Sequence, residues 1–400
     1  MQHTELLHNL LEKSGAIQHK GRLKSLMTAV SSVMNGANLS LTSMGRHISK
    51  EIKPKSKIKE VDYLLSNGHL HRERTSIYKA VNEWVIGQEK LLLIVIDWSS
   101  IVAHQQHMLR ASIIRKGRCM TVYEEIYPEK KLANGESHAL FLKNLRLVLP
   151  KEREVIIIAD AGFRTDFFMQ VQTNDWDFLA RVLSNMKYIK HDDELWQRCP
   201  ELYEQATSEP ADIGKVKLAK SNKIKCHLYL YKKLKEDTDK AGQVRVRKIT
   251  HGKREKDYRN AASKPWLIAA SRKLSAEKVM KIYSKRMKIE HDFRDSKDPK
   301  WGMGMRESRS CDPHRLTIQL LIGFLASFML WLIGLCLEEQ GRHRDFQANS
   351  IKHKRILSLI FLALEAIRNG YMKFISQSDF IRIKQNLYDE DMCSIFAGIT

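Results

Sequence analysis

The stretch Leu91-Leu-Leu-Ile-Val-Ile-Asp97 is a continuous apolar run that ends in an acid and is followed by Trp98-Ser99-Ser100. A short apolar run of this kind is typical of a β-strand that is buried on both faces. A second such run, Glu154-Val-Ile-Ile-Ile-Ala-Asp160, also ends in an acid and is followed by Ala161-Gly162. The two runs predict neighbouring buried strands of an α/β sheet whose terminal carboxylates converge.

The segments around these strands fit the same sheet. Residues 108–114 and 119–127, joined by a turn at 115–118, have the pattern of a hairpin, and residues 138–149 that of a helix ended by Pro150. Short alternating strands follow residue 182, and residues 265–270 return to a core strand. The order strand, hairpin, helix, strand predicts a mixed α/β sheet and not an alternating βαβ series.

Helices are predicted on either side of the sheet. Residues 1–88 carry apolar residues at intervals of three and four, which is typical of a bundle of short amphipathic helices. Within them, residues 41–48 and the basic run 50–59 fit a helix-turn-helix that presents lysines to DNA. Pro54 interrupts that run, and a merely solvated charged face fits it equally. The chain from Leu316 onward is predicted to be helical.

The composition is strongly basic, with 68 Lys and Arg against 46 Asp and Glu and a formal net charge of +22. A charge of this size favours polyanionic partners, either nucleic acid or an anionic membrane surface. The six cysteines form no CxxC pair or zinc-ligand spacing, so reduced thiols are expected. The N-terminus lacks the apolar run of a signal peptide, which makes a cytoplasmic protein the expectation.

Leu316 to Leu337 is long enough to cross a bilayer and contains only three polar side chains, Thr317, Gln319 and Ser327. The segment is solitary and lies in a chain that is otherwise rich in charge. A helix buried on all sides in a large soluble protein has the same composition. We expect the buried helix and no membrane partner, with a membrane-associated basic protein as an alternative.

A third acid lies on a helix that is predicted to begin after Ser275 and to run to about Lys297. At about 100° per residue, four polar side chains fall on one narrow face of this helix. They are Tyr283, Arg286, Glu290 and Lys297. A neighbouring apolar stripe would pack on the sheet and leave Glu290 at the boundary between core and solvent.

Each of these features has a plainer interpretation. An acid after a buried strand is often only a turn or cap residue, and a glutamate between basic residues on a helix often only forms surface ion pairs. His291, Asp292 and Asp295 project away from the direction of Glu290, so we expect them to face solvent. The pair Asp97 and Asp160 becomes informative only together with the third acid.

The motifs resemble those of the DDE transposases of the insertion sequence 4 family. The matching residues are DWS at Asp97, DAGF at Asp160 and YSKRMKIEHDFRDSK from Tyr283, which fits the family signature Y-x2-R-x3-E-x6-K at every spacing. The resemblance covers almost the whole chain, including VDYLLSNGHLHRER at residues 61–74, and is greatest to the transposase of transposon 10.

This resemblance implies an α/β architecture in three parts. Residues 89–315 would form an RNase H-like catalytic core, a mixed sheet flanked by helices, with a β-strand insertion at about 183–264. A helical DNA-binding domain, residues 1–88, would precede the core. A helical region, residues 316–400, would follow it and serve core packing and dimerisation.

The resemblance also implies the residues of the site. Asp97, Asp160 and Glu290 would be the catalytic, metal-binding acids and would hold two Mg²⁺ ions, for which Mn²⁺ would substitute, about 3.5 to 4 Å apart. One ion would activate the attacking water or 3′-hydroxyl, and the other would stabilise the leaving oxygen.

Further residues of the motif would contact DNA near the cut, namely Tyr283, Arg286 and Lys297. Trp266 would stack on a flipped base while cleavage proceeds through a DNA hairpin. A core tryptophan beside Pro265 is the plainer interpretation of Trp266. Arg181 and the basic loop 232–264 fit contacts to the DNA backbone, but an ion pair and a solvated loop fit them equally.

The implied function is that of a bacterial, nucleoid-associated transposase that acts as a homodimer in a synaptic complex. It would bind the terminal inverted repeats of its insertion sequence, cleave both strands and join the 3′ ends to target DNA. The alternative is a catalytically inactive, transposase-derived DNA-binding protein. The presence of all three acids speaks against that alternative.

Overall fold

The computed structural model describes residues 4–101, 105–190, 193–232, 265–348, 350–351, 354–385 and 387. The chain divides into two compact units, which are described one at a time. Unit 1 comprises residues 1–90, 97–153 and 287–392, and unit 2 comprises residues 91–96, 154–286 and 393–400. Strand β1 (Leu91–Ile101) contributes its first six residues to unit 2 and the remainder to unit 1.

Unit 2 is built on a mixed sheet. Here β1 pairs in parallel with β4 (Glu154–Ala159), and β4 pairs in parallel with β5 (Asp177–Arg181). Strand β10 (Trp266–Ala270) then runs antiparallel to β5. The predicted buried strands and the return strand at 265–270 are confirmed. The apolar residues of β1 and β4 form the centre of the sheet because both faces of these strands are covered.

An antiparallel extension continues the sheet of unit 2 in the order β10-β9-β8-β6-β7. These strands are β9 (Ile224–Tyr231), β8 (Ala211–Leu218), β6 (Lys187–Lys190) and β7 (Gln197–Arg198), followed after β7 by the 3₁₀ turn η4 (Cys199–Gln205). They lie inside the range predicted for a β-strand insertion. The basic loop, apart from Lys232, lies outside the described residues. Helix α7 (Thr165–Gln172) contacts β5, and α10 (Ala276–Ser284) contacts β5 and β9.

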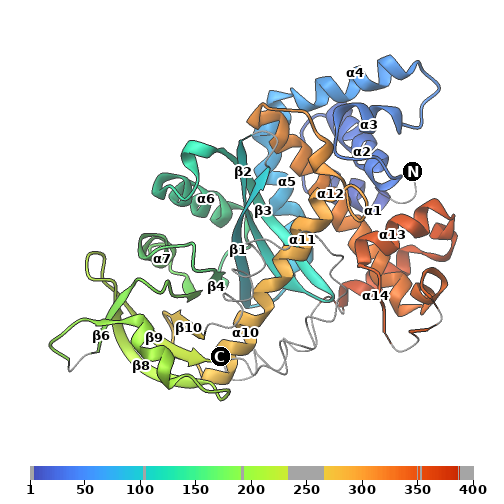
Figure 1. Ribbon diagram of the computed structural model, residues 1–400. Helices are drawn as coiled ribbons and strands as arrows, with labels where there is room; N and C mark the ends of the chain where they lie inside the picture. Colours follow the sequence, from blue (N-terminus) through green and yellow to red (C-terminus); the bar gives the residue numbers. More distant parts are fainter. Residues whose placement is uncertain are drawn as a thin grey trace, which may run out of the picture. The chain divides into compact units, whose positions relative to one another are not determined.

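Unit 1 contains the predicted hairpin, formed by β2 (Gln106–Arg115) and β3 (Arg118–Pro128), in the strand order β3-β2-β1. The hairpin turns at Gly117, whose φ of +77° favours glycine. The turn η3 (Glu129–Lys131) leads to α6 (Gly135–Val148), whose first turn is capped by the side chain of Asn134. Figure 1 shows α6 on one side of the hairpin and α11 (Lys288–Lys297) on the other.

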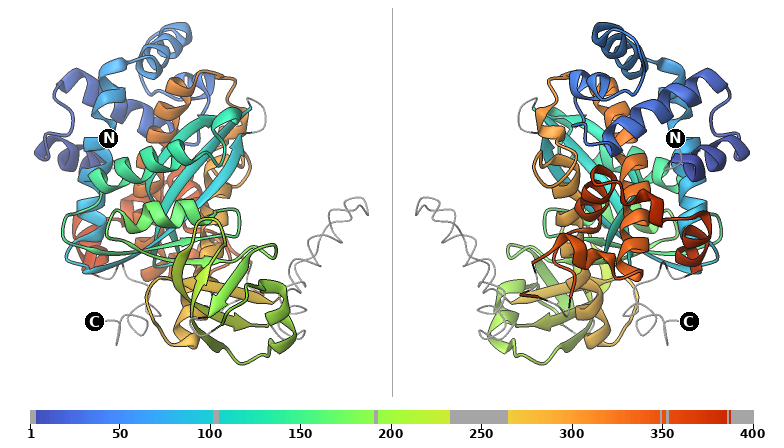
Figure 2. Two further views of the ribbon diagram at one scale, coloured as in Figure 1. Left: turned by 90° about the vertical axis from the view of Figure 1, so that its left-hand side faces the viewer. Right: turned by 90° about the vertical axis from the view of Figure 1, so that its right-hand side faces the viewer.

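The N-terminal part of unit 1 is helical, as predicted, and its helices gather at one end of that unit (Figure 2). They are α1 (Glu5–Lys13), α2 (Lys20–Met34), α3 (Leu41–Arg46), α4 (Pro54–Leu65) and α5 (Gly68–Ile86). Pro54 does not break a helix but begins α4, where its missing N–H costs nothing. Helices α3 and α4 approach closely, since a Cβ on Gly45 would lie 2.6 Å from the Cα of Ile58.

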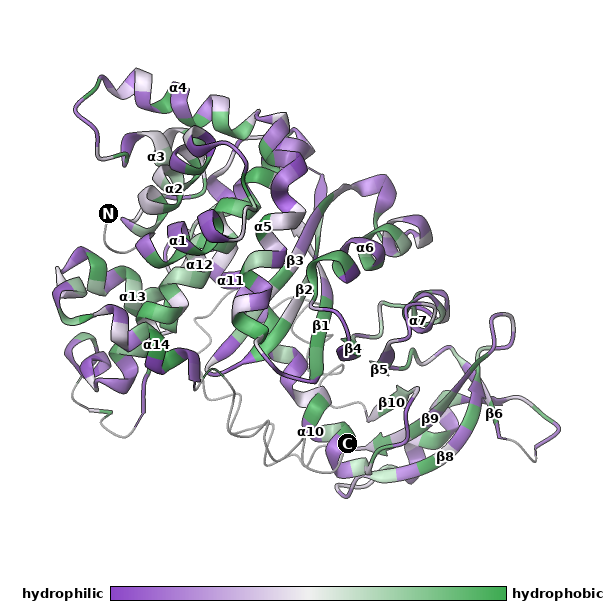
Figure 3. Ribbon diagram, turned by 180° about the vertical axis from the view of Figure 1, so that it is seen from behind, coloured by the Kyte–Doolittle hydropathy of each residue, from purple (hydrophilic) through white to green (hydrophobic). Residues whose placement is uncertain are grey.

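The C-terminal part of unit 1 is built around α12 (Pro313–Glu339). This helix is long and apolar enough to cross a bilayer, but every residue from Leu316 to Leu337 is buried within the unit. Helices α2, α5 and α13 (Leu359–Arg368) and strand β3 all contact it, and its hydrophobic character is evident in Figure 3. The expected buried helix is therefore observed, and α12 serves core packing.

Shorter elements complete unit 1. They are η6 (Met305–Glu307), η7 (Arg342–Phe346), η8 (Tyr371–Phe374) and α14 (Gln377–Gln385). Taken together, the mixed sheet of strands β1 to β10 with helices packed on it is an RNase H-like α/β fold. The helical segments at both ends of the described chain agree with the predicted fold class.

Candidate active site

Asp97 and Asp160 occupy matching positions on two paired strands. Ile96 of β1 pairs with Ala159 of β4 in the parallel register, and each acid is the next residue along its own chain segment. Asp160 follows the last residue of β4, as predicted, whereas β1 continues past Asp97 to Ile101. Each acid therefore directly follows one residue of the pair Ile96–Ala159. Asp97 is the first residue of its segment in unit 1, and Asp160 belongs to unit 2.

Short local hydrogen bonds orient both carboxylates. The backbone N–H of Trp98 donates to Oδ1 of Asp97 at 2.8 Å, and Asp97 is buried. The backbone N–H of Gly162 donates to Oδ1 of the half-buried Asp160, also at 2.8 Å. A Cβ on Gly162 would lie 3.0 Å from that oxygen, so a larger residue would crowd the carboxylate. The small residue after Asp160 thus leaves room for the turn that holds the acid.

In unit 1, Asp97 and Glu290 both act on Lys297. The Nζ of Lys297 donates to the hydroxyl of Ser99 and, at 2.9 Å, to the carbonyl of Ser100. Burial lowers the pKa of Lys297 to about 8, helped by the charges of nearby arginines, while Glu290 and Asp97 act in the opposite direction. Glu290 itself is exposed in the first turn of α11. The structure therefore brings two of the predicted acids and the predicted lysine into one electrostatic environment.

In unit 2, the other predicted residues gather around Tyr283. The ring of Tyr283 packs edge to face against Trp266, with centroids 5.2 Å apart. Burial raises the pKa of Tyr283 to about 12, although the positive charges of Arg286 and Arg181 oppose this and the negative charge of Asp160 adds to it. Arg181 also donates to the carbonyl of the residue before Trp266, at 3.4 Å. Tyr283 is therefore accompanied by two cations, an indole and the carboxylate of Asp160.

The helix predicted from Ser275 to Lys297 begins and ends as expected, but it is not a regular α-helix along its whole length. Ser275 caps it as expected, but the segment is divided into α10, the 3₁₀ turn η5 (Lys285–Met287) and α11. The segment contains neither proline nor glycine, so no local signal marks the break. A 3₁₀ turn has about three residues per turn, which shifts the angular phase of α11 relative to α10. Tyr283 and Lys297, expected on a polar face, are both buried. Tyr283 packs against Trp266, and Lys297 donates to Ser99 and Ser100.

The prediction that Asp292 and Asp295 face solvent is also wrong, whereas His291 is exposed as predicted. Both aspartates are almost fully buried because the β2–β3 hairpin covers their side of α11 and supplies Arg110 and Arg118 as counter-charges. Neither arginine was among the predicted site residues. Charged residues inside otherwise apolar hairpin strands were the available signal.

The donor chemistry of the three acids suits a magnesium site, because Mg²⁺ prefers carboxylate oxygens. Among the described residues, no group of three or more His, Cys, Asp or Glu side chains lies close enough together to hold a metal ion. Asp97 and Glu290 belong to unit 1 and Asp160 belongs to unit 2.

The chain matches the model of one known protein family. A family model described as "Transposase DDE domain" matches residues 89–329, which is more than half of the chain. The matched range contains all three acids and the whole segment from Tyr283 to Lys297. No curated protein matches the chain.

Proposed function

Because the chain belongs to the transposase DDE domain family, we propose that it is a metal-dependent transposase of the insertion sequence 4 type, similar to that of transposon 10. The observation that carries this proposal is the placement of the acids. Asp97 and Asp160 directly follow two residues, Ile96 and Ala159, that are paired on adjacent parallel strands. Glu290 and Asp97 both act electrostatically on Lys297. In such a protein residues 1–88 bind DNA, residues 89–315 form the core with its insertion at 183–264, and residues 316–400 support packing and dimerisation.

In this proposal Asp97, Asp160 and Glu290 hold two Mg²⁺ ions, and Mn²⁺ substitutes. When bound, the ions activate the attacking oxygen and stabilise the leaving one. Cleavage of both strands and joining of the 3′ ends are the same displacement at phosphorus with different nucleophiles. The buried position of Asp97 and the turn that orients Asp160 favour a fixed carboxylate geometry.

The basic residues around the acids would bind the DNA backbone. Arg286 offers a guanidinium fork and Lys297 an ammonium that Ser99 and Ser100 hold in place. Tyr283 keeps its phenolic proton at neutral pH and can donate it to a phosphate oxygen. Trp266, half-buried beside Tyr283, would stack on the base that is flipped during formation of a DNA hairpin.

The N-terminal helices would recognise the terminal inverted repeats, with α4 as the contacting helix. Lys55, Lys59 and Tyr63 recur every four residues and are exposed along one face of α4. The Nζ of Lys59 lies 5.5 Å from the centroid of the Tyr63 ring. Lys57, by contrast, donates to the carbonyl of Ile48 at 2.8 Å and so ties α4 to the segment that follows α3. Exposed lysines with an aromatic neighbour suit a nucleic-acid backbone.

The test is a cleavage assay on labelled DNA that carries the ends of the coding element, with Mg²⁺ or EDTA and with Asp97→Ala alongside. Nicks at the element boundary that need Mg²⁺ and are absent for Asp97→Ala would support the proposal. A variant that still cuts would refute the assignment of Asp97. Tight binding without cleavage by the wild-type protein would favour the inactive, transposase-derived DNA-binding protein instead.

A second copy of the chain is part of the proposal, since two transposon ends must be held together in a synaptic complex. Helix α12 is buried in the core of unit 1 from Leu316 to Leu337. The dimer surface would therefore come from the remaining C-terminal helices. Sedimentation of the protein with and without end DNA would test this. A complex that contains one chain for each pair of ends would contradict it.

A further inference from the structure

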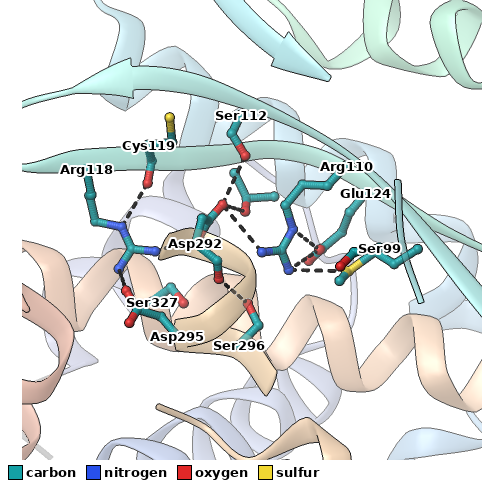
Figure 4. Close-up of polar contacts among 12 residues, drawn as sticks. Ser99, Arg110, Ser112, Arg118, Cys119, Glu124, Asp292, Asp295, Ser296 and Ser327 are labelled. Carbon is teal, nitrogen blue, oxygen red and sulfur yellow. Dashed lines mark hydrogen bonds and ion pairs between the residues drawn. The ribbon is translucent and has the colours of Figure 1, made fainter. Parts of the chain in front are cut away.

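A buried cluster of charged side chains joins α11 to the β2–β3 hairpin within unit 1 (Figure 4). We call it the clamp cluster, and each of its side chains is at most 5% exposed. Its members are Arg110 on β2, Arg118 and Glu124 on β3, and Asp292 and Asp295 on α11. The cluster thus connects the helix that carries Glu290 and Lys297 to two strands almost two hundred residues earlier in the chain.

Asp292 is the centre of the clamp cluster. Its Oδ1 accepts a hydrogen bond from Arg118 at 2.5 Å, and its Oδ2 accepts from the hydroxyls of Ser112 and Thr121, both at 2.9 Å. Arg110 lies 3.4 Å from the same Oδ2. Burial on its own would raise the pKa of Asp292, but the two arginines outweigh it and lower the pKa. One carboxylate of α11 is therefore tied to both strands of the hairpin.

The two arginines of the clamp cluster are themselves held on a second side. Arg110 pairs with Glu124 at 2.6 Å, and its guanidinium lies 5.0 Å from the centroid of the Phe293 ring. Arg118 also pairs with Asp295 at 3.1 Å. Directional contacts therefore reach α11 at three positions within four residues.

The C-terminal end of α11 is fixed by close backbone packing. The backbone N–H of Met303 donates to the carbonyl of Asp295 at 2.7 Å. A Cβ on Gly302 would lie 2.1 Å from the same carbonyl oxygen, so only glycine fits there. The chain that follows α11 returns against the helix directly beside the clamp cluster.

A buried ion-pair cluster is a poor source of stability, because the cost of removing charges from water offsets their attraction. Its contacts are directional, however, and an apolar helix face could rotate or slide where this one cannot. At about 100° per residue, Glu290 lies about 200° away from Asp292 around the helix axis. Fixing Asp292 against the hairpin consequently turns Glu290 away from it, and Glu290 is exposed.

We propose that Asp292 is a positioning residue that sets the rotation and register of α11, and hence the positions of Glu290 and Lys297. This inference rests on the proposed function of those two residues, but the clamp itself can be tested without any cleavage. Asp292 touches neither DNA nor metal in this proposal. It acts through the helix that carries the residues that do.

The experiment compares the full-length wild type with Asp292→Asn, which keeps the shape but removes the charge. The matched control is Glu136→Gln, which removes the charge of an exposed carboxylate at the start of α6 whose partner Lys131 lies 2.9 Å away. We expect kcat for cleavage of end DNA to fall by about 100-fold in Asp292→Asn, because misplacement of a reacting group by about 1 Å has that effect. The Kd for the same DNA should stay within about twofold of wild type, since residues 1–88 are unchanged.

Hydrogen exchange read by mass spectrometry provides the second measurement. In Asp292→Asn, the amides of residues 288–297 should exchange at least about tenfold faster than in wild type, while those of α12 keep their protection. Glu136→Gln should match wild type in both measurements. If Asp292→Asn does not fold, Thr121→Val, which removes one donor to Asp292, should show the same changes at smaller size.

Unchanged kcat together with unchanged exchange of residues 288–297 would overturn the inference. Faster exchange of α12 together with α11 would also overturn it, because that result indicates a general stabilising role and not positioning. Failure of the proposed function would look different. The wild-type protein would then show no metal-dependent cleavage, and the exchange measurement would still decide whether Asp292 clamps α11.

Discussion

The predicted site residues of unit 1 and those of unit 2 are held in place by different kinds of contact. In unit 1, Lys297 is fixed by hydrogen bonds to Ser99 and Ser100, and the helix beneath it by the buried ion pairs of Asp292. In unit 2, Tyr283 packs against the ring of Trp266 and lies near the charges of Arg286 and Arg181. Charged hydrogen bonds tolerate little displacement, whereas aromatic packing tolerates more. Substitutions in the ion pairs around α11 should therefore impair chemistry, and those of the aromatic residues of unit 2 should impair the handling of DNA.

The largest effect is expected for the acids, which test whether the two units contribute to one site. Glu290→Gln in unit 1 and Asp160→Asn in unit 2 should each lower kcat for cleavage by about 10⁴-fold, because each removes a charge that the metals require. DNA affinity should change little. The double variant should be no slower than either single one, since members of one catalytic unit are not additive. Additive losses would mean that the acids act in separate places.

A smaller effect is expected from the buried lysine of unit 1. The pKa of Lys297 is lowered from 10.5 to about 8, so the unfolded chain binds its proton more tightly than the folded protein does. Stability from this source is therefore present above pH 10.5 and is lost as pH falls through 8. Relative to Lys297→Met, the free energy of unfolding of the wild type should rise by about 3 kcal/mol across that window.

Urea denaturation of both proteins at several pH values between 8 and 10.5 measures this difference. Lys143→Met, at an exposed position of α6, is the control for the loss of a lysine side chain as such. A difference between wild type and Lys297→Met that is flat with pH would mean that Lys297 is more solvated than its position indicates.

The contrast between the units also explains what sequence patterns could and could not predict. The acids at 97 and 160 were predictable because an apolar run followed by a carboxylate is a local signal. The clamp cluster was not, because Asp292 finds its partners Arg110 and Arg118 across the fold, and angular placement on a helix does not reveal which face a distant hairpin covers. The 3₁₀ turn at Lys285–Met287 contains neither proline nor glycine, so no local signal in the sequence predicts it.

The aromatic contacts of unit 2 should give a moderate and selective effect. Trp266→Ala removes a stacking surface worth about 1 to 3 kcal/mol per base, so formation of the DNA hairpin should slow by about 10- to 100-fold. First-strand nicking should stay within about threefold, since the acids are untouched. Trp266→Phe, which keeps an aromatic face, should recover most of the loss.

A gel that separates nicked, hairpin and fully cut products would measure both steps in one reaction. Equal slowing of nicking and hairpin formation in Trp266→Ala would indicate that the residue supports Tyr283 structurally, through their 5.2 Å ring contact, and does not stack on DNA. In that case the contrast between the two units would rest on the arginines alone.

The smallest effect on DNA binding or cleavage is expected at α4, which carries none of the three predicted acids. Lys59→Ala removes one exposed ammonium, so end-DNA affinity should fall a fewfold at moderate salt, and the slope of log K against log salt should become shallower by about 0.9. The kcat at saturating DNA should not change. Lys143→Ala, at an exposed position of α6, serves as the matched control and should leave the slope as it is. If both variants alter the slope equally, the charge of the whole molecule attracts the DNA and α4 has no privileged part in the contact.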